Sequence, residues 1–122
     1  MLLFPDSLPA VLDMSVMTTI RALGSPGEPD VYTEVAQLFL ADVPVHLEAL
    51  RVAIAAGRPE QVERIAHRLR GGALEMGALR MAPLCAALEQ SARAGCLQQA
   101  EDKLESLHQE FALARTALEE VI

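Results

Sequence analysis

The stretch PEQVERIAHRLRGGALEMG, residues 59–77, predicts a helix with two unlike faces. When its residues are placed at about 100° per position around a helix axis, apolar side chains gather within about 60° of Leu69. These residues are Val62, Ile65, Ala66, Gly72, Ala73 and Met76. A stripe of this kind is typical of an amphipathic helix that packs on a hydrophobic core. We therefore predict a helix over 59–76 with Leu69 at the centre of its buried face.

His67 lies about 160° from Leu69 on the same wheel, which places it on the solvent face. A histidine among apolar neighbours is often a buried core residue, and this position excludes that interpretation. An exposed histidine without a function remains an alternative on geometry alone. The outward half of the helix also holds Glu60, Glu63, Arg64, Arg70, Gly71 and Leu74.

Two of these outward neighbours are unusual for a surface that meets only water. Gly71, one turn after His67, costs about 1 kcal/mol relative to alanine inside a helix, which favours a close approach of another molecule's backbone. Leu74 exposes apolar surface, as a docking patch does, although single exposed leucines are common. Three arginines add positive potential that favours a phosphorylated imidazole and an acidic partner, or they pair with glutamates of the same helix. These arginines are Arg64, Arg68 and Arg70.

The segments on either side of this helix repeat their apolar residues at helical spacing and are separated by Gly and Pro. Further helices are predicted over 13–23, 30–56, 80–94 and 98–121. The connections after the second, third and fourth helices are short, which makes consecutive helices antiparallel neighbours. We predict an all-α chain in which residues 12–122 form an antiparallel up-and-down four-helix bundle. The short first helix would cap one end, and residues 1–11 would be an N-terminal extension or linker.

Two of the predicted helices carry more specific expectations. Pro44 lies inside the second helix, where it removes a backbone donor and clashes one turn back, so we expect a kink or a break near Asp42 and Val43. Asp30 is the expected N-cap of that helix. The first helix is expected to bury its apolar residues, which are Val16, Met17, Ile20 and Leu23.

Composition limits both the core and the partners. Hydrophobic residues make up 52% of the chain and aromatic residues only 3%, so the core is built from aliphatic side chains, as in a helix bundle. The net charge of -7 argues against a nucleic-acid partner, because phosphate backbones attract a surplus of Lys and Arg. Cys85 and Cys96 lack CxxC spacing, which fits reduced thiols.

The first residues, MLLFPDSLP, have no basic region and contain two prolines, so we expect neither a signal peptide nor direct membrane insertion. This favours a cytoplasmic location. The chain would be a cytoplasmic protein or the cytoplasmic domain of a membrane-anchored parent protein.

The segment AHRLRGGALEMGA, residues 66–78, resembles the signature AHxLKGxxxxxGA of the histidine-containing phosphotransfer (HPt) domain. The similarity extends over about residues 12–121. It includes LCAALEQSARAG at 84–95 and, in the second predicted helix, Phe39, Pro44, Leu50 and Ala53.

The resemblance implies a four-helix bundle with an exposed histidine, here His67, that exchanges a phosphoryl group with aspartates of response-regulator receiver domains in a two-component phosphorelay. It also implies a basic residue three positions on and a glycine four positions on, here Arg70 and Gly71. Arg70 stands where lysine is usual, which keeps the charge but replaces a point donor with a planar fork.

Such a carrier needs positioning and charge neutralisation more than acid–base groups of its own. The sequence shows no acidic cluster around His67 suited to Mg²⁺ and no Gly-rich nucleotide loop. We therefore expect no cofactor of its own and no autonomous kinase activity, with Mg²⁺ supplied by the receiver during transfer. A hybrid sensor histidine kinase, in cis or in trans, is a further expected partner.

Two other functions remain open from the sequence. A helical adaptor would bind a receiver or kinase through the same surface without being phosphorylated. A di-metal carboxylate bundle would use Glu105 and His108, which have Glu-x-x-His spacing, but this site needs a second copy of the motif that the chain lacks. His46 has no partner at ligand spacing and is interpreted as structural or solvated.

Overall fold

The computed structural model describes residues 10–122, and within them the chain is helical without a strand. The helices are α1 (Met14–Ala22), α2 (Val31–Ala55), α3 (Pro59–Met76), α4 (Met81–Arg93) and α5 (Ala100–Val121). Each begins and ends within one or two residues of its predicted range, and the all-α class is confirmed. Residues 1–9, most of the predicted N-terminal extension, lie outside the described part.

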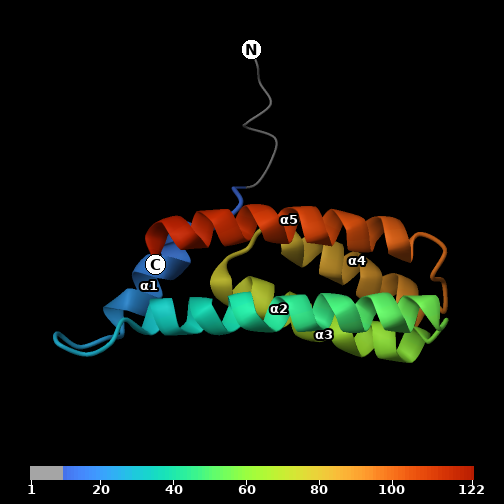
Figure 1. Cartoon of the computed structure of the whole chain (residues 1–122), viewed down its shortest axis with the longest axis horizontal. Coiled ribbons are helices and arrows are strands. Elements are labelled where there is room, and N and C mark those ends of the chain that lie inside the picture. Colours follow the sequence, from blue (N-terminus) through green and yellow to red (C-terminus); the bar gives the residue numbers. More distant parts are fainter. Residues whose placement is uncertain (1–9) are drawn as a thin grey trace, which may run out of the picture.

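Helices α2 to α5 form the bundle (Figure 1). Each packs against the next one along the chain, and α5 closes the bundle by packing on α2. Helix α1 lies across one end and contacts α2 and α3, so the predicted capping helix is confirmed. Within residues 10–122 no helix is both long and apolar enough to cross a lipid bilayer.

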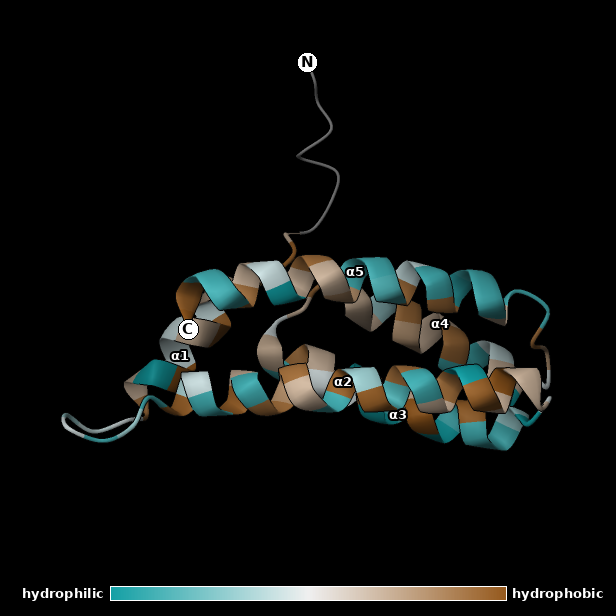
Figure 2. Cartoon of the chain, viewed as in Figure 1, coloured by the Kyte–Doolittle hydropathy of each residue, from teal (hydrophilic) through white to brown (hydrophobic). Residues whose placement is uncertain are grey.

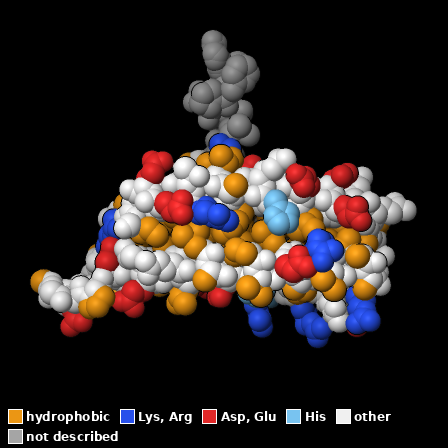
Figure 3. All heavy atoms as spheres, in the orientation of Figure 1, with side chains coloured by type: hydrophobic (Ala, Val, Ile, Leu, Met, Phe, Trp, Pro, Cys, Tyr) orange, Lys and Arg blue, Asp and Glu red, His pale blue; other side chains and the backbone are white. Residues whose placement is uncertain are grey.

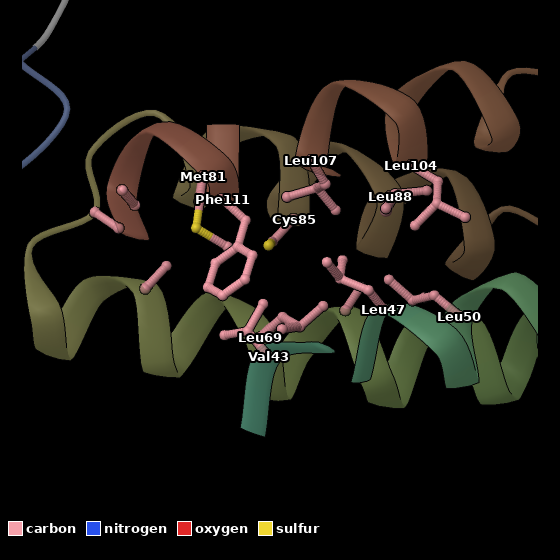
Figure 4. Packing of buried hydrophobic residues seen from close by; sticks show 14 of the residues in the cluster. Val43, Leu47, Leu50, Leu69, Met81, Cys85, Leu88, Leu104, Leu107 and Phe111 are labelled. Carbon is pink, nitrogen blue, oxygen red and sulfur yellow. The ribbon is translucent and has the colours of Figure 1, made fainter. Parts of the chain in front are cut away.

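Aliphatic side chains from all four long helices meet inside the bundle (Figure 4). The ribbon coloured by hydropathy shows the alternation of polar and apolar residues that produces this core (Figure 2). Phe39 of α2 and Phe111 of α5 meet edge to face, with ring centroids 6.0 Å apart, a favourable aromatic geometry. On the side formed by α2 and α5, hydrophobic side chains show mainly along the seam between the helices, with charged ones on either side of it (Figure 3).

Helix α2 is continuous through Pro44, which excludes a break near Asp42 and Val43; of the two predicted alternatives, the kink at Pro44 stays a prediction. Val43 and Leu47 are both buried on the same face, and the packing of that face holds the two halves in one helix. Pro44 itself is exposed. Asp30 caps the helix as predicted, since its carboxylate accepts a hydrogen bond from the Tyr32 backbone N–H at 3.1 Å.

The predicted burial of apolar residues in α1 is only partly correct. Leu23 is 77% exposed because the helix ends at Ala22 and Leu23 already leads into the following loop, so its predicted burial is wrong. The other three residues, Val16, Met17 and Ile20, are half-buried. Leu12, just before the helix, is the residue of this region that enters the core.

Gly77 ends α3 and also positions α1. Its φ of +72° is a left-handed conformation that favours glycine, and a Cβ there would lie only 3.0 Å from side-chain atoms of Asp13 and Val16. The Gly77 carbonyl accepts a hydrogen bond from the Asp13 backbone N–H at 2.7 Å. Gly77, the last glycine of the 66–78 segment, therefore fixes the capping helix against the end of α3.

Candidate functional site

His67 lies in the middle of α3, and its side chain is 66% exposed, which confirms the outward orientation predicted from the helical wheel. An open hollow surrounds it between α3 and α4. The hollow is lined by Glu63, Arg64, Arg68, Gly71, Glu89 and Arg93. Of the predicted site residues, Arg64, Arg68 and Gly71 thus share this hollow with His67.

Leu74 and Arg70, the two remaining predicted site residues, lie outside the hollow lining. Leu74 is 58% exposed one turn beyond Arg70 on α3, as the wheel predicts. Arg70 is half-buried and points toward α4. The structure therefore places Leu74 on the open surface and Arg70 in the contact between two helices.

Gly71 faces open space. A Cβ built on it would have nothing within 4 Å, and its φ is not in the left-handed region. Among residues 10–122, neither packing nor backbone conformation therefore requires glycine at this position.

Glu89 of α4 is the main contact of His67 that the sequence did not predict. It is only 5% exposed, and within residues 10–122 it is the one charged side chain that is fully buried. Its Oε2 lies 2.9 Å from His67 Nδ1. Its Oε1 forms an ion pair with Arg70 Nε at 3.0 Å. A buried carboxylate thus connects the exposed histidine to the interior of the α3–α4 contact.

Glu89 remains ionised in this environment. Burial alone raises the pKa of a carboxyl group, but the hydrogen bond from His67 and the charges of Arg70 and Arg93 outweigh it and lower the pKa of Glu89. Because folding lowers this pKa, the interactions of Glu89 stabilise the bundle at neutral pH, and that contribution is lost as the pH falls through the carboxyl range.

The charge of Glu89 decides which nitrogen of His67 carries the proton. Arg70 Nη2 also approaches Nδ1, at 3.3 Å, but Nδ1 cannot accept from Arg70 and donate to Glu89 at once. The carboxylate at 2.9 Å is the closer and stronger partner, so Nδ1 carries the hydrogen and donates it to Glu89. The lone pair of the neutral imidazole is then on Nε2.

Arg93 of α4 completes the charged group around the histidine. Its Nη2 lies 3.2 Å from Glu89 Oε2, the same oxygen that contacts His67. Its Nε donates to Glu63 Oε2 of α3 at 2.8 Å. Arg93 therefore links α3 and α4 beside His67 while its side chain stays 61% exposed.

One sequence signal could have revealed Glu89. It lies four positions after Cys85, directly after Leu88 and three positions before Ala92, so it belongs to the apolar stripe of α4. A charged residue on a buried stripe needs a partner, and His67 and Arg70 provide it. Arg93 carried no comparable signal, because an exposed arginine at the end of a helix is common.

Other reactive side chains lie elsewhere. Glu105 and His108 are both exposed on α5, so they do not form a metal site inside the bundle. In the described residues, no group of three or more His, Cys, Asp and Glu residues is arranged to hold a metal ion. His46 is half-buried, and its Nδ1 contacts the Asp42 carbonyl at 2.9 Å. Burial raises the pKa of the Cys85 thiol to about 12, which makes it unreactive.

A four-helix bundle that presents a histidine on its third helix, among arginines and against a buried carboxylate, has the features of a phosphoryl-carrying domain. The family model described as "Hpt domain" matches residues 34–120. The chain therefore belongs to the Hpt domain family. This membership gives it a histidine phosphotransfer role in phosphorelays, together with receiver domains and kinases.

Solved structures agree with this assignment. The chain is similar to histidine-containing phosphotransfer protein B from Pseudomonas aeruginosa PAO1, with 32% identity and a TM-score of 0.83 over 90% of this chain and 92% of that one. It shares the fold of the histidine-containing phosphotransfer protein MtHPt2 from Medicago truncatula, with 24% identity and a TM-score of 0.78 over 90% of this chain and 76% of that one. No curated protein sequence matches the chain.

Proposed function

We propose that His67 is the phosphoryl-accepting residue and that the domain carries the group between receiver aspartates without kinase activity of its own. The observation that supports this most strongly is the hydrogen bond from Nδ1 to the buried Glu89, in a His67 side chain that is 66% exposed. It fixes the orientation of the imidazole and directs the Nε2 lone pair toward solvent, where a partner approaches.

In the transfer step, the Nε2 lone pair of His67 attacks the phosphorus of an aspartyl phosphate. The N–P bond forms as the bond from phosphorus to the aspartyl oxygen breaks, and the carboxylate leaves with the bonding electrons. The proton on Nδ1 stays in place, so the product ring is a phosphorylated imidazolium. Glu89 stabilises the positive charge of that ring, and return of the group to an aspartate reverses each change.

We assign the neutralisation of the phosphoryl charge to two sources. Arg64 and Arg68 line the hollow and provide positive potential from this chain. Mg²⁺ comes with the receiver, and the domain binds no cofactor of its own. Arg70, the basic residue that the resemblance implies three positions after His67, acts mainly on Glu89 in the unphosphorylated state.

Receiver domains are the proposed docking partners, together with a hybrid sensor kinase in cis or in trans. The open space over Gly71 lets a partner backbone approach within a turn of His67. Leu74 extends the contact along α3. A groove lies between α2 and α3, and Leu38 on its α2 side is 64% exposed and extends the contact onto α2. We place this encounter in the cytoplasm. The net charge of -7 disfavours nucleic acid as a partner.

Gly71→Gln is expected to slow phosphoryl transfer from a receiver and to weaken receiver binding without lowering the stability of the domain. Glutamine is the better helix former, and its side chain enters space that is empty within this chain. Transfer kinetics and thermal unfolding measure the two effects separately. Transfer at the wild-type rate would show that Gly71 is not a point of close approach.

The carrier role is tested by comparing two phosphoryl donors. Labelled ATP with Mg²⁺ is expected to leave the domain unlabelled, because its sequence contains no Gly-rich nucleotide-binding loop. A receiver phosphorylated on its aspartate, with Mg²⁺, is expected to label the domain with an acid-labile, base-stable phosphate. Label from ATP alone would contradict the carrier assignment. Receiver binding without labelling across a broad panel of receivers would favour the adaptor function.

A further inference from the structure

Two arginines approach His67 from different surroundings, and the Nη2 of Arg70 lies 3.3 Å from the ring nitrogen Nδ1. Arg70 is held by Glu89 through an ion pair of 3.0 Å and is absent from the lining of the hollow. Arg93 lines that hollow, and its side chain is 61% exposed. The two arginines therefore occupy different positions around the same histidine, one within the helix contact and one at the surface.

The position of Arg93 relative to the imidazole follows from a shared acceptor. Glu89 Oε2 accepts from His67 Nδ1 at 2.9 Å and from Arg93 Nη2 at 3.2 Å. Two donors on one oxygen atom lie close together, so the guanidinium is beside the imidazole ring. A phosphoryl group on this ring comes within reach of a long side chain whose guanidinium already lies beside it.

The other contact of Arg93 is replaceable. Glu63 holds its Nε at 2.8 Å, but Arg93 is exposed and Glu63 is about one-third exposed. Surface ion pairs of this kind contribute about 0–1 kcal/mol. A phosphoryl dianion offers more charge and matches the planar fork of arginine, so it competes well for this side chain.

We propose that Arg93 binds the phosphoryl oxygens of phosphorylated His67, while Arg70 is a positioning residue that holds Glu89 against Nδ1. This inference rests on the proposed role of His67. On phosphorylation, the guanidinium of Arg93 exchanges the Glu63 carboxylate for the oxygens of the new N–P group. Arg93 thus stabilises the product of transfer from α4, whereas the other arginines that line the hollow belong to α3.

The test uses Arg93→Ala and Arg93→Lys in the full chain, phosphorylated chemically with phosphoramidate and also by a receiver. Phosphorus NMR follows the ionisation of the phosphoryl group from monoanion to dianion as the pH rises. Loss of Arg93 is expected to move this ionisation to higher pH, because a nearby cation favours the dianion. Arg93→Lys is expected to restore part of the shift. Transfer from the receiver is expected to slow about tenfold in Arg93→Ala, the size of one charged hydrogen bond.

Two control variants separate phosphoryl binding from a structural link between helices. Glu63→Gln breaks the ion pair but keeps Arg93, so it is expected not to reproduce the shift to higher pH. Arg115→Ala removes an exposed arginine on α5 that stacks over Phe111, and it is expected to leave the ionisation unchanged. Circular dichroism confirms that each variant is folded before it is compared.

If the wild-type protein is phosphorylated on His67 and the ionisation of the phosphoryl group is unchanged in Arg93→Ala, the role of Arg93 is overturned. The role of His67 stays intact in that case. Glu63→Gln could instead slow transfer and raise the pH of the ionisation as much as Arg93→Ala does. That result would also overturn the role of Arg93 in phosphoryl binding and would show that its ion pair with Glu63 links α3 and α4 structurally. Wild-type protein that takes up no phosphate on His67 from either donor would overturn both proposals.

Discussion

His67→Gln is expected to abolish phosphoryl acceptance from a phosphorylated receiver while the domain stays folded. Glutamine has no ring nitrogen that can form the N–P bond, and no other described histidine lies in the hollow. The side chain of His67 is 66% exposed, so its loss removes little packing. Labelling by the receiver measures the first effect, and thermal unfolding followed by circular dichroism measures the second.

The hydrogen bond to Glu89 sets the size of the stability change in this variant. Glutamine keeps a polar group near the carboxylate, and Arg70 and Arg93 continue to pair with Glu89. We therefore expect a change within about 1 kcal/mol. A loss of several kcal/mol would mean that His67 is a structural residue, and labelling that persists in the variant would move the acceptor to another side chain.

Leu69→Ala is expected to have the opposite effect and to lower the free energy of unfolding by about 2–5 kcal/mol. Leu69 is 2% exposed, two positions from His67 on the opposite face of α3, and it packs among side chains of the other helices (Figure 4). Its truncation leaves a cavity that the surrounding helices fill only in part. Urea unfolding measured by circular dichroism gives the difference from wild type.

Leu74→Ala is the matched control, since it makes the same substitution on the same helix at a side chain that is 58% exposed. It is expected to change stability by no more than about 0.5 kcal/mol. Equal losses at the two positions would contradict the assignment of the two faces of α3. A large loss confined to Leu69 would support the orientation that also exposes His67.

Much of the fold was predictable because helix boundaries and buried faces depend on local patterns. The apolar spacing around Leu69 identified the buried face of α3, and the position of His67 opposite that stripe predicted its exposure. A Cβ at Gly71 would meet no atom within 4 Å among the described residues, which is compatible with the predicted close approach of a partner but does not test it. The two conclusions on Leu69 and His67 needed only the period of a helix.

The errors and omissions arose where contacts between distant segments decide the outcome. Helix α2 continues through Pro44 because its buried face packs on both sides of that residue, which local propensity does not show. Leu23 is exposed because α1 ends one residue before it. The pairing of Glu89 with His67 joins two helices across 22 positions, and no spacing within one helix predicts it.

The central claim, that Nε2 of His67 carries the phosphoryl group while Nδ1 keeps its proton, is tested most directly by imidazole ¹⁵N NMR. The protein is labelled with ¹⁵N at histidine and phosphorylated by a receiver, and ¹⁵N–³¹P coupling identifies the bonded nitrogen. We expect coupling at Nε2 of His67 and a proton retained on Nδ1, in agreement with its hydrogen bond to Glu89 at 2.9 Å. Coupling at Nδ1, or at His46 or His108, would contradict the account.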